Sequence, residues 1–142
     1  MASTGPARRA CLLSNGAYST VLRAGGTGFS SWHDISLTRW REDMTCDSWG
    51  THLLIRDEHD GALWPATGHP SDKTPAATFR PGCAQFVHSA GGLKGTLQVA
   101  VAHDADVELR QLALENDGES ARELSVLLRS GAYESCTADL DR

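Results

Sequence analysis

The sequence predicts an all-β domain built as an antiparallel β-sandwich, and three observations support this prediction. Short segments alternate apolar and polar residues, as strands with one buried face do. Clusters of Asn, Asp and Gly, which tolerate the backbone conformations of tight turns, separate these segments at near-regular intervals. No long window repeats apolar residues at the helical spacing of i, i+3, i+4 and i+7.

The expected strands follow one another along the chain. In the N-terminal half they cover residues 17–22, 29–40, 52–56 and 62–65, with turn residues at 14–16 and 57–61. A glycine-rich stretch at 24–28 lacks the Lys-Ser/Thr end of a phosphate-binding loop, so we interpret it as a bend that needs positive φ. Residues 66–75, rich in Pro, Gly, Ser and Asp, are expected to form a surface loop.

The C-terminal half continues this pattern. Strands are expected at 76–80 and 84–88, and then at 96–101, where positions 97, 99 and 101 form an apolar face. The last expected strand covers 124–129, with apolar residues at positions 124, 126 and 128. It has no later strand to pair with, so we expect an open sheet edge, which a second copy of the chain could cover in a homodimer.

The segment 106–116 departs from simple alternation. Val107 and Leu109 are apolar residues at odd-numbered positions, whereas Leu112 and Leu114 are at even-numbered positions. In a regular strand these two pairs would point to opposite faces. A β-bulge near position 110 or 111 would produce this change of register. The alternative is a strand that is buried on both faces, and the pattern does not decide between them.

Composition narrows the range of functions. A chain of 142 residues, 40% of them hydrophobic and 22% charged, suits one folded domain. The net charge of −5 argues against a nucleic-acid partner, because phosphate binding needs a basic surface. No apolar run approaches a membrane helix, and no signal-peptide pattern is present, so we expect a cytoplasmic chain that does not insert into membranes. The cysteines at positions 11, 46, 83 and 136 are widely spaced and are expected to be reduced thiols.

No catalytic or metal-binding pattern stands out. The six histidines lack metal-ligand spacings, and the adjacent residues Ser31, His33 and Asp34 cannot converge as a triad, because neighbouring strand residues point to opposite faces. We therefore predict no catalytic residue, no metal and no cofactor. The stretch 32–50 holds three of the four tryptophans together with Arg and Asp, which suits either a carbohydrate surface or an aromatic cluster against another domain. The residues expected to make these contacts are Asp34, Arg39, Trp40, Arg41, Asp47 and Trp49.

A series of ordered motifs makes the sequence recognisable. They are LSNGAYS (13–19), AGGTGFS (24–30), WHD (32–34), RWRED (39–43), TCD (45–47), WG (49–50), LIRD (54–57), GALW (61–64) and VELRQLALEN (107–116). Together they resemble the N-terminal β-sandwich domain of the glycoside hydrolase family 94 phosphorylases. The likeness is greatest to the phosphorylase-like region of cyclic β-1,2-glucan synthases.

This resemblance implies a supersandwich of the galactose-mutarotase type, with its first part present over residues 12–130 between tails at 1–11 and 131–142. In the family an (α/α)6 barrel follows and provides the general acid for inverting phosphorolysis. No residue here matches that acid, so the chain is expected to be non-catalytic, to pack on the barrel and to help shape the carbohydrate site. The alternative is a free-standing carbohydrate-binding module for β-glucans. The resemblance implies a parent protein that is a glycosyltransferase or glycoside phosphorylase and that is anchored to the inner membrane.

Overall fold

The computed structural model describes residues 9–38, 50–67 and 76–130. These residues form eleven strands and no helix. The strands are β1 (Ala10–Ser14), β2 (Tyr18–Arg23), β3 (Gly28–Trp32), β4 (Ile35–Ser36), β5 (Thr51–Asp57), β6 (Leu63–Pro65), β7 (Ala76–Arg80), β8 (Cys83–Ala90), β9 (Leu93–Val101), β10 (Glu108–Asn116) and β11 (Leu124–Ser130). The first strand begins at Ala10, inside the expected N-terminal tail, and residues 131–142 lie outside the described residues.

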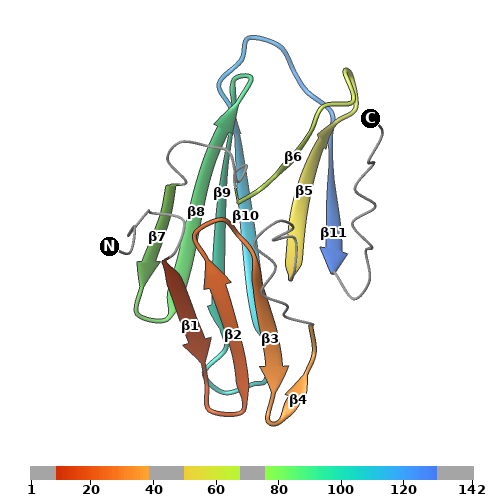
Figure 1. Cartoon of the computed structure of the whole chain (residues 1–142). Coiled ribbons are helices and arrows are strands. Elements are labelled where there is room, and N and C mark those ends of the chain that lie inside the picture. Colours follow the sequence, from red (N-terminus) through yellow and green to blue (C-terminus); the bar gives the residue numbers. More distant parts are fainter. Residues whose placement is uncertain (1–8, 39–49, 68–75, 131–142) are drawn as a thin grey trace, which may run out of the picture.

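The strands form three antiparallel sheets, as expected for the all-β class (Figure 1). The first sheet has the order β1-β2-β3-β4, the second β10-β9-β8-β7 and the third β11-β5-β6. The first sheet packs on the second through contacts of β1 and β2 with β9. The third sheet brings together strands from the two halves of the chain, because β11 pairs with β5.

The core lies between these sheets and follows the period-two pattern of the strands. Leu97 and Val99 on β9 and Phe86 on β8 are at most 1% exposed. Leu22 reaches them from the first sheet and Ile55 from the third. Burying each of these large side chains contributes about 1.5–3 kcal/mol, so the core shared by the three sheets contributes strongly to stability.

The structure corrects the interpretation of the segment 106–116, because neither a bulge nor burial on both faces is found. The pairing of β10 with β9 runs without interruption from Glu108 to Asn116. Leu109 points outward and is 55% exposed, whereas Leu112 packs against the core. The inward positions nearest the start of β10 are taken by Glu108 and Arg110, which form an ion pair. Polar side chains on the buried face therefore produced the apparent change of register.

One strand prediction and one loop prediction are also corrected. The expected strand at 29–40 is broken by a turn at 33–34, and residues 39 and 40 lie outside the described residues. The turn is tight enough to place His33 at a φ of +49°. The expected surface loop at 66–75 starts with two buried residues, because the Ala66 amide hydrogen-bonds to the Leu53 carbonyl and Thr67 packs against Gly26. Gly26 has a φ of +86°, which confirms the positive φ expected for the glycine-rich bend.

Candidate functional site

The structure describes one of the six predicted contact residues. Asp34 is exposed in the turn between β3 and β4. The other five lie outside the described residues, namely Arg39, Trp40, Arg41, Asp47 and Trp49. The geometry of the site is therefore built from the residues that border this segment and from those around Asp34.

Both borders of the segment 39–49 are held on β3. Thr38 is buried, and its Oγ1 accepts a hydrogen bond from the Ser30 backbone amide at 2.8 Å. Gly50 lies so close to Gly28 that an added Cβ would stand 2.7 Å from the Gly28 carbonyl oxygen, and its φ is +116°. A glycine is required there, because no side chain fits between the two backbones. The strand that carries Gly28 and Ser30 thus fixes the positions where the segment leaves and re-enters the sheets.

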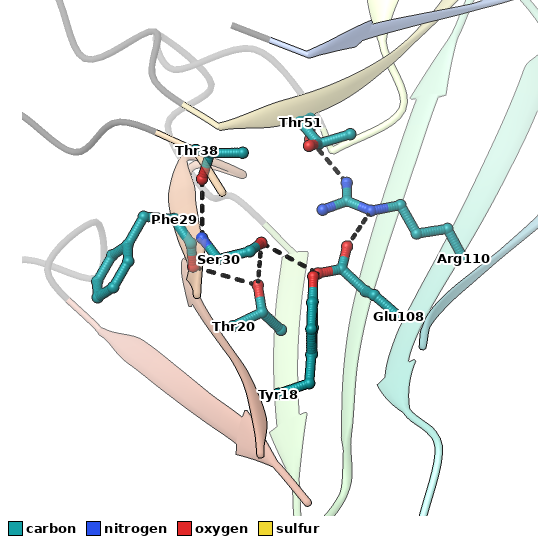
Figure 2. A network of polar contacts seen from close by, with 8 residues as sticks. All are labelled: Tyr18, Thr20, Phe29, Ser30, Thr38, Thr51, Glu108 and Arg110. Atoms are coloured by element: carbon teal, nitrogen blue, oxygen red, sulfur yellow. Dashed lines mark hydrogen bonds and ion pairs between the residues drawn. The ribbon is translucent and has the colours of Figure 1, made fainter. Parts of the chain in front are cut away.

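A buried polar cluster beside these borders links all three sheets (Figure 2). We define it as Tyr18, Ser30, Thr51, Glu108 and Arg110. Glu108 is its centre: its Oε2 accepts hydrogen bonds from the Tyr18 hydroxyl at 2.9 Å and the Ser30 hydroxyl at 3.3 Å. Its Oε1 accepts the Arg110 Nε hydrogen bond at 2.6 Å, and Arg110 also donates to the Thr51 carbonyl at 2.7 Å. The first, second and third sheets are therefore joined through one carboxylate and one guanidinium.

The chemistry of this cluster is structural. Both carboxylate oxygens of Glu108 already accept hydrogen bonds, and Thr20 Oγ1 lies 3.2 Å from the Ser30 hydroxyl. Burial raises the pKa of the Tyr18 hydroxyl; the Ser30 side chain, the next largest influence, lowers it in part, and the negative charge of Glu108 raises it again. Tyr18 therefore remains a neutral donor. Among the described residues no buried side-chain nitrogen or oxygen lacks a partner. A cluster whose bonds are all satisfied holds the sheets in place.

A second polar group surrounds Trp32, next to Asp34. The Trp32 indole Nε1 donates to Asp106 Oδ2 at 2.7 Å, and Asn15 Nδ2 donates to Asp106 Oδ1 at 3.2 Å. The hydrogen bond from Trp32 lowers the pKa of the Asp106 carboxyl most, and the bond from Asn15 lowers it further. The carboxyl therefore stays ionised. The His33 ring lies against the indole, with 4.7 Å between ring centroids. Sequence reasoning missed Asn15 and Asp106, because only the fold brings these two turn residues together.

A hollow lies at the end of the third sheet where β5 finishes and β11 begins. It has a volume of about 370 Å³ and is bordered by the turn at 57–60 and by residues 120–123. Asp57 is 5% exposed, accepts the His59 amide at 2.9 Å and faces the Arg122 guanidinium at 3.6 Å. These contacts keep the β5–β6 turn and the start of β11 together.

Other reactive groups are few in the part of the chain that the structure describes. Cys11 and Cys83 are free thiols, and burial, followed by the nearby Cys83, raises the pKa of Cys11. No three His, Cys, Asp or Glu side chains among these residues gather into a metal-binding group. Within the same residues, no helix has the length and apolar character needed to cross a bilayer.

The described residues define an all-β domain, in which hydrogen bonds to a buried Glu108–Arg110 ion pair connect three antiparallel sheets. A family model described as "Glycosyl hydrolase 94, supersandwich domain" matches residues 2–133, and the chain belongs to this family. It is 37% identical over 123 residues to the cyclic beta-(1,2)-glucan synthase NdvB of Rhizobium meliloti (strain 1021). That match covers 84% of this chain and 4% of the relative, so the chain corresponds to a small part of that protein. The resemblance deduced from the motifs is confirmed.

Proposed function

We propose that this chain is a non-catalytic β-sandwich domain of a protein similar to cyclic β-1,2-glucan synthases and glycoside phosphorylases. Its role is to pack on an (α/α)6 catalytic barrel and to help shape the carbohydrate site of that barrel. The observation that supports this role most directly is the row of exposed apolar side chains on β11, which is an edge strand of the third sheet among the described residues.

Strand β11 lies at the edge of the third sheet, and among the described residues β5 is the strand that pairs with it. Val126 pairs with Ile55 and so faces the core side of the sheet, yet Val126 is 50% exposed while Ile55 is 1% exposed. Leu127 and Leu128 are 43% and 66% exposed. Three consecutive apolar residues on an open edge are an aggregation hazard unless another polypeptide covers them. This arrangement favours a domain that is covered in its parent protein.

The six predicted contact residues belong to the same proposal. Arginines at 39 and 41 can bridge carboxylates of the barrel or donate to sugar hydroxyls, and tryptophans at 40 and 49 can stack on sugar rings. Asp34 and Asp47 add hydrogen-bond acceptors. The hydrogen bond of Thr38 and the close approach of Gly50 to Gly28 support this assignment, because they place the two residues that border the segment beside β3.

We place the domain in a reducing, cytoplasmic compartment as part of the proposal, with the parent protein held at the inner membrane. The free thiols of Cys11 and Cys83 support this assignment, because such thiols persist under reducing conditions. No cofactor and no nucleic acid take part in the proposed role. A free-standing β-glucan-binding module is the second candidate, and the exposed indole of Trp32 favours it.

The test is a binding titration between the chain and a separately produced family 94 catalytic barrel. Leu128→Ser should weaken the complex by about tenfold or more, because it removes an apolar side chain from the contact. Leu12→Ser is the matched control, since Leu12 is 65% exposed on β1, far from the edge of β11. Equal effects of the two variants, or no complex at all, would contradict the proposal. A dimer of the chain alone that Leu128→Ser abolishes would identify a second copy as the occupant.

A further inference from the structure

Trp32 occupies an unusual position at the end of β3. It continues the inward register of Gly28 and Ser30, which are buried, but Trp32 itself is 39% exposed. Its cross-strand neighbours in the same row are Tyr18 and Ile35. Tyr18 is buried and hydrogen-bonds to Glu108, whereas Ile35 is 56% exposed. Across β2, β3 and β4, these neighbouring side chains therefore change from Tyr18, in the buried polar cluster, to Ile35, on an exposed apolar surface.

The indole is fixed in place by groups that lie outside the core. Its Nε1 donates to the exposed carboxylate of Asp106 at 2.7 Å. Asn15 holds that carboxylate from the other side and also donates to the carbonyls of Ala102 and Ala105, at 3.1 and 2.9 Å. The Asn15 Oδ1 accepts the amides of residues 17 and 18. These hydrogen bonds hold the indole in one orientation at the surface, where 39% of Trp32 remains exposed to a ligand.

The groups around the ring match the chemistry of a pyranose. An aromatic ring presents an apolar surface to the C–H face of a sugar, and carboxylates accept hydrogen bonds from its hydroxyls. Each oxygen of Asp106 accepts one hydrogen bond in the structure and has a further lone pair available. Asp34 and His33 are exposed in the adjacent turn. Because the hydrogen bonds to Asp106 orient the Trp32 ring before a ligand binds, less conformational entropy is lost on binding.

We propose that Trp32 and Asp106 form a subsite for one glucose-type ring of a β-glucan chain. This inference rests on the proposed function for its class of ligand and adds residues that were not among the six predicted contact residues. Trp32 stacks on the sugar ring, Asp106 accepts from one or two hydroxyls, and Asn15 is a positioning residue that holds the carboxylate.

The test is an NMR titration of the full chain with β-1,2-linked gluco-oligosaccharides, in which the four indole N–H signals are assigned by single Trp→Phe variants. The Trp32 signal should shift with a Kd near 1 mM. Asp106→Ala should weaken binding about tenfold, as expected for the loss of a charge-assisted hydrogen bond. Asp104→Ala is the matched control, because Asp104 is exposed in the same loop, and it should leave the Kd unchanged.

The outcomes separate this inference from the proposed function. A shift of the signals of Trp40 or Trp49 without that of Trp32 would overturn the subsite and leave a sugar-binding role of the segment 39–49 in place. If no indole signal moves, the subsite is also overturned, whereas packing on the barrel is judged by the separate titration of Leu128→Ser. Equal losses for Asp106→Ala and Asp104→Ala would show a general charge effect and would contradict the specific role of Asp106.

Discussion

Replacing Arg110 with Met is expected to destabilise the protein by about 3 kcal/mol. Arg110 and Glu108 are each 11% exposed at the side chain, and their Nε–Oε1 distance is 2.6 Å. Removing one partner of a buried ion pair typically costs about 3–5 kcal/mol. The lower end applies here, because Glu108 keeps hydrogen bonds from Tyr18 and Ser30, although the Thr51 carbonyl loses its donor. This cost corresponds to a change of roughly 100-fold in the unfolding equilibrium.

The assay is urea unfolding followed by tryptophan fluorescence, with Glu115→Gln as the matched control. Glu115 is on the same strand and pairs with Lys94 at 3.0 Å, but these side chains are 56% and 39% exposed. Breaking that pair should cost less than about 1 kcal/mol, and the cost should vanish in high salt, whereas the cost of Arg110→Met should persist. The double variant Glu108→Gln/Arg110→Met should recover part of the loss, because no uncompensated charge remains. If Arg110→Met cost no more than Glu115→Gln, the buried polar cluster would not join the sheets as we argue.

Three further predictions follow from single contacts. Gly28→Ala should destabilise the protein by about 3 kcal/mol or more in thermal unfolding, since the new Cβ would lie 1.9 Å from the Val21 carbonyl oxygen. Gly25→Ala is the control and should be neutral, because its Cβ would meet no atom within 4 Å. Tyr18 should ionise at a higher pH than its ordinary value of 10.0 in an ultraviolet titration assigned with Tyr18→Phe, and stability should fall as the pH rises past that value, because only the unfolded phenol then ionises. Cys11, whose pKa is raised from 9.0, should alkylate more slowly in the folded than in the unfolded chain, and equal rates in site-resolved mass spectrometry would contradict its burial.

The sequence predicts the fold well wherever apolar residues mark the buried face of a strand. The expected strand at 76–80 coincides with β7, and positions 97 and 99 of β9 are fully buried as expected. The prediction fails at β10, where Glu108 and Arg110 face inward. A pattern of residue types cannot distinguish a buried ion pair from a solvated face, because the partners that satisfy the charges, Tyr18 and Thr51, lie on strands far away in the sequence.

The candidate site is predicted less completely than the fold. Asp34 is exposed in the turn that follows Trp32, and its role in binding stays a prediction. Asn15 and Asp106 were not predicted, although both lie in segments with turn-forming residues. Their side chains meet across 91 positions of sequence, and such a contact depends on how two sheets pack. Local patterns identify turns but do not show which turns meet.

The pairing of β5 with β11 has a consequence for the time course of folding in the cell. All four strands of the second sheet lie between these two partners in the sequence, so β5 lacks its neighbour on one side until synthesis has passed residue 130. Pairings between such distant segments form slowly, and the unpaired strand exposes apolar surface in the meantime. Ile55, which ends fully buried, is then open to solvent or to a chaperone. The yield of folded protein should therefore depend on how quickly the ribosome delivers the last strand.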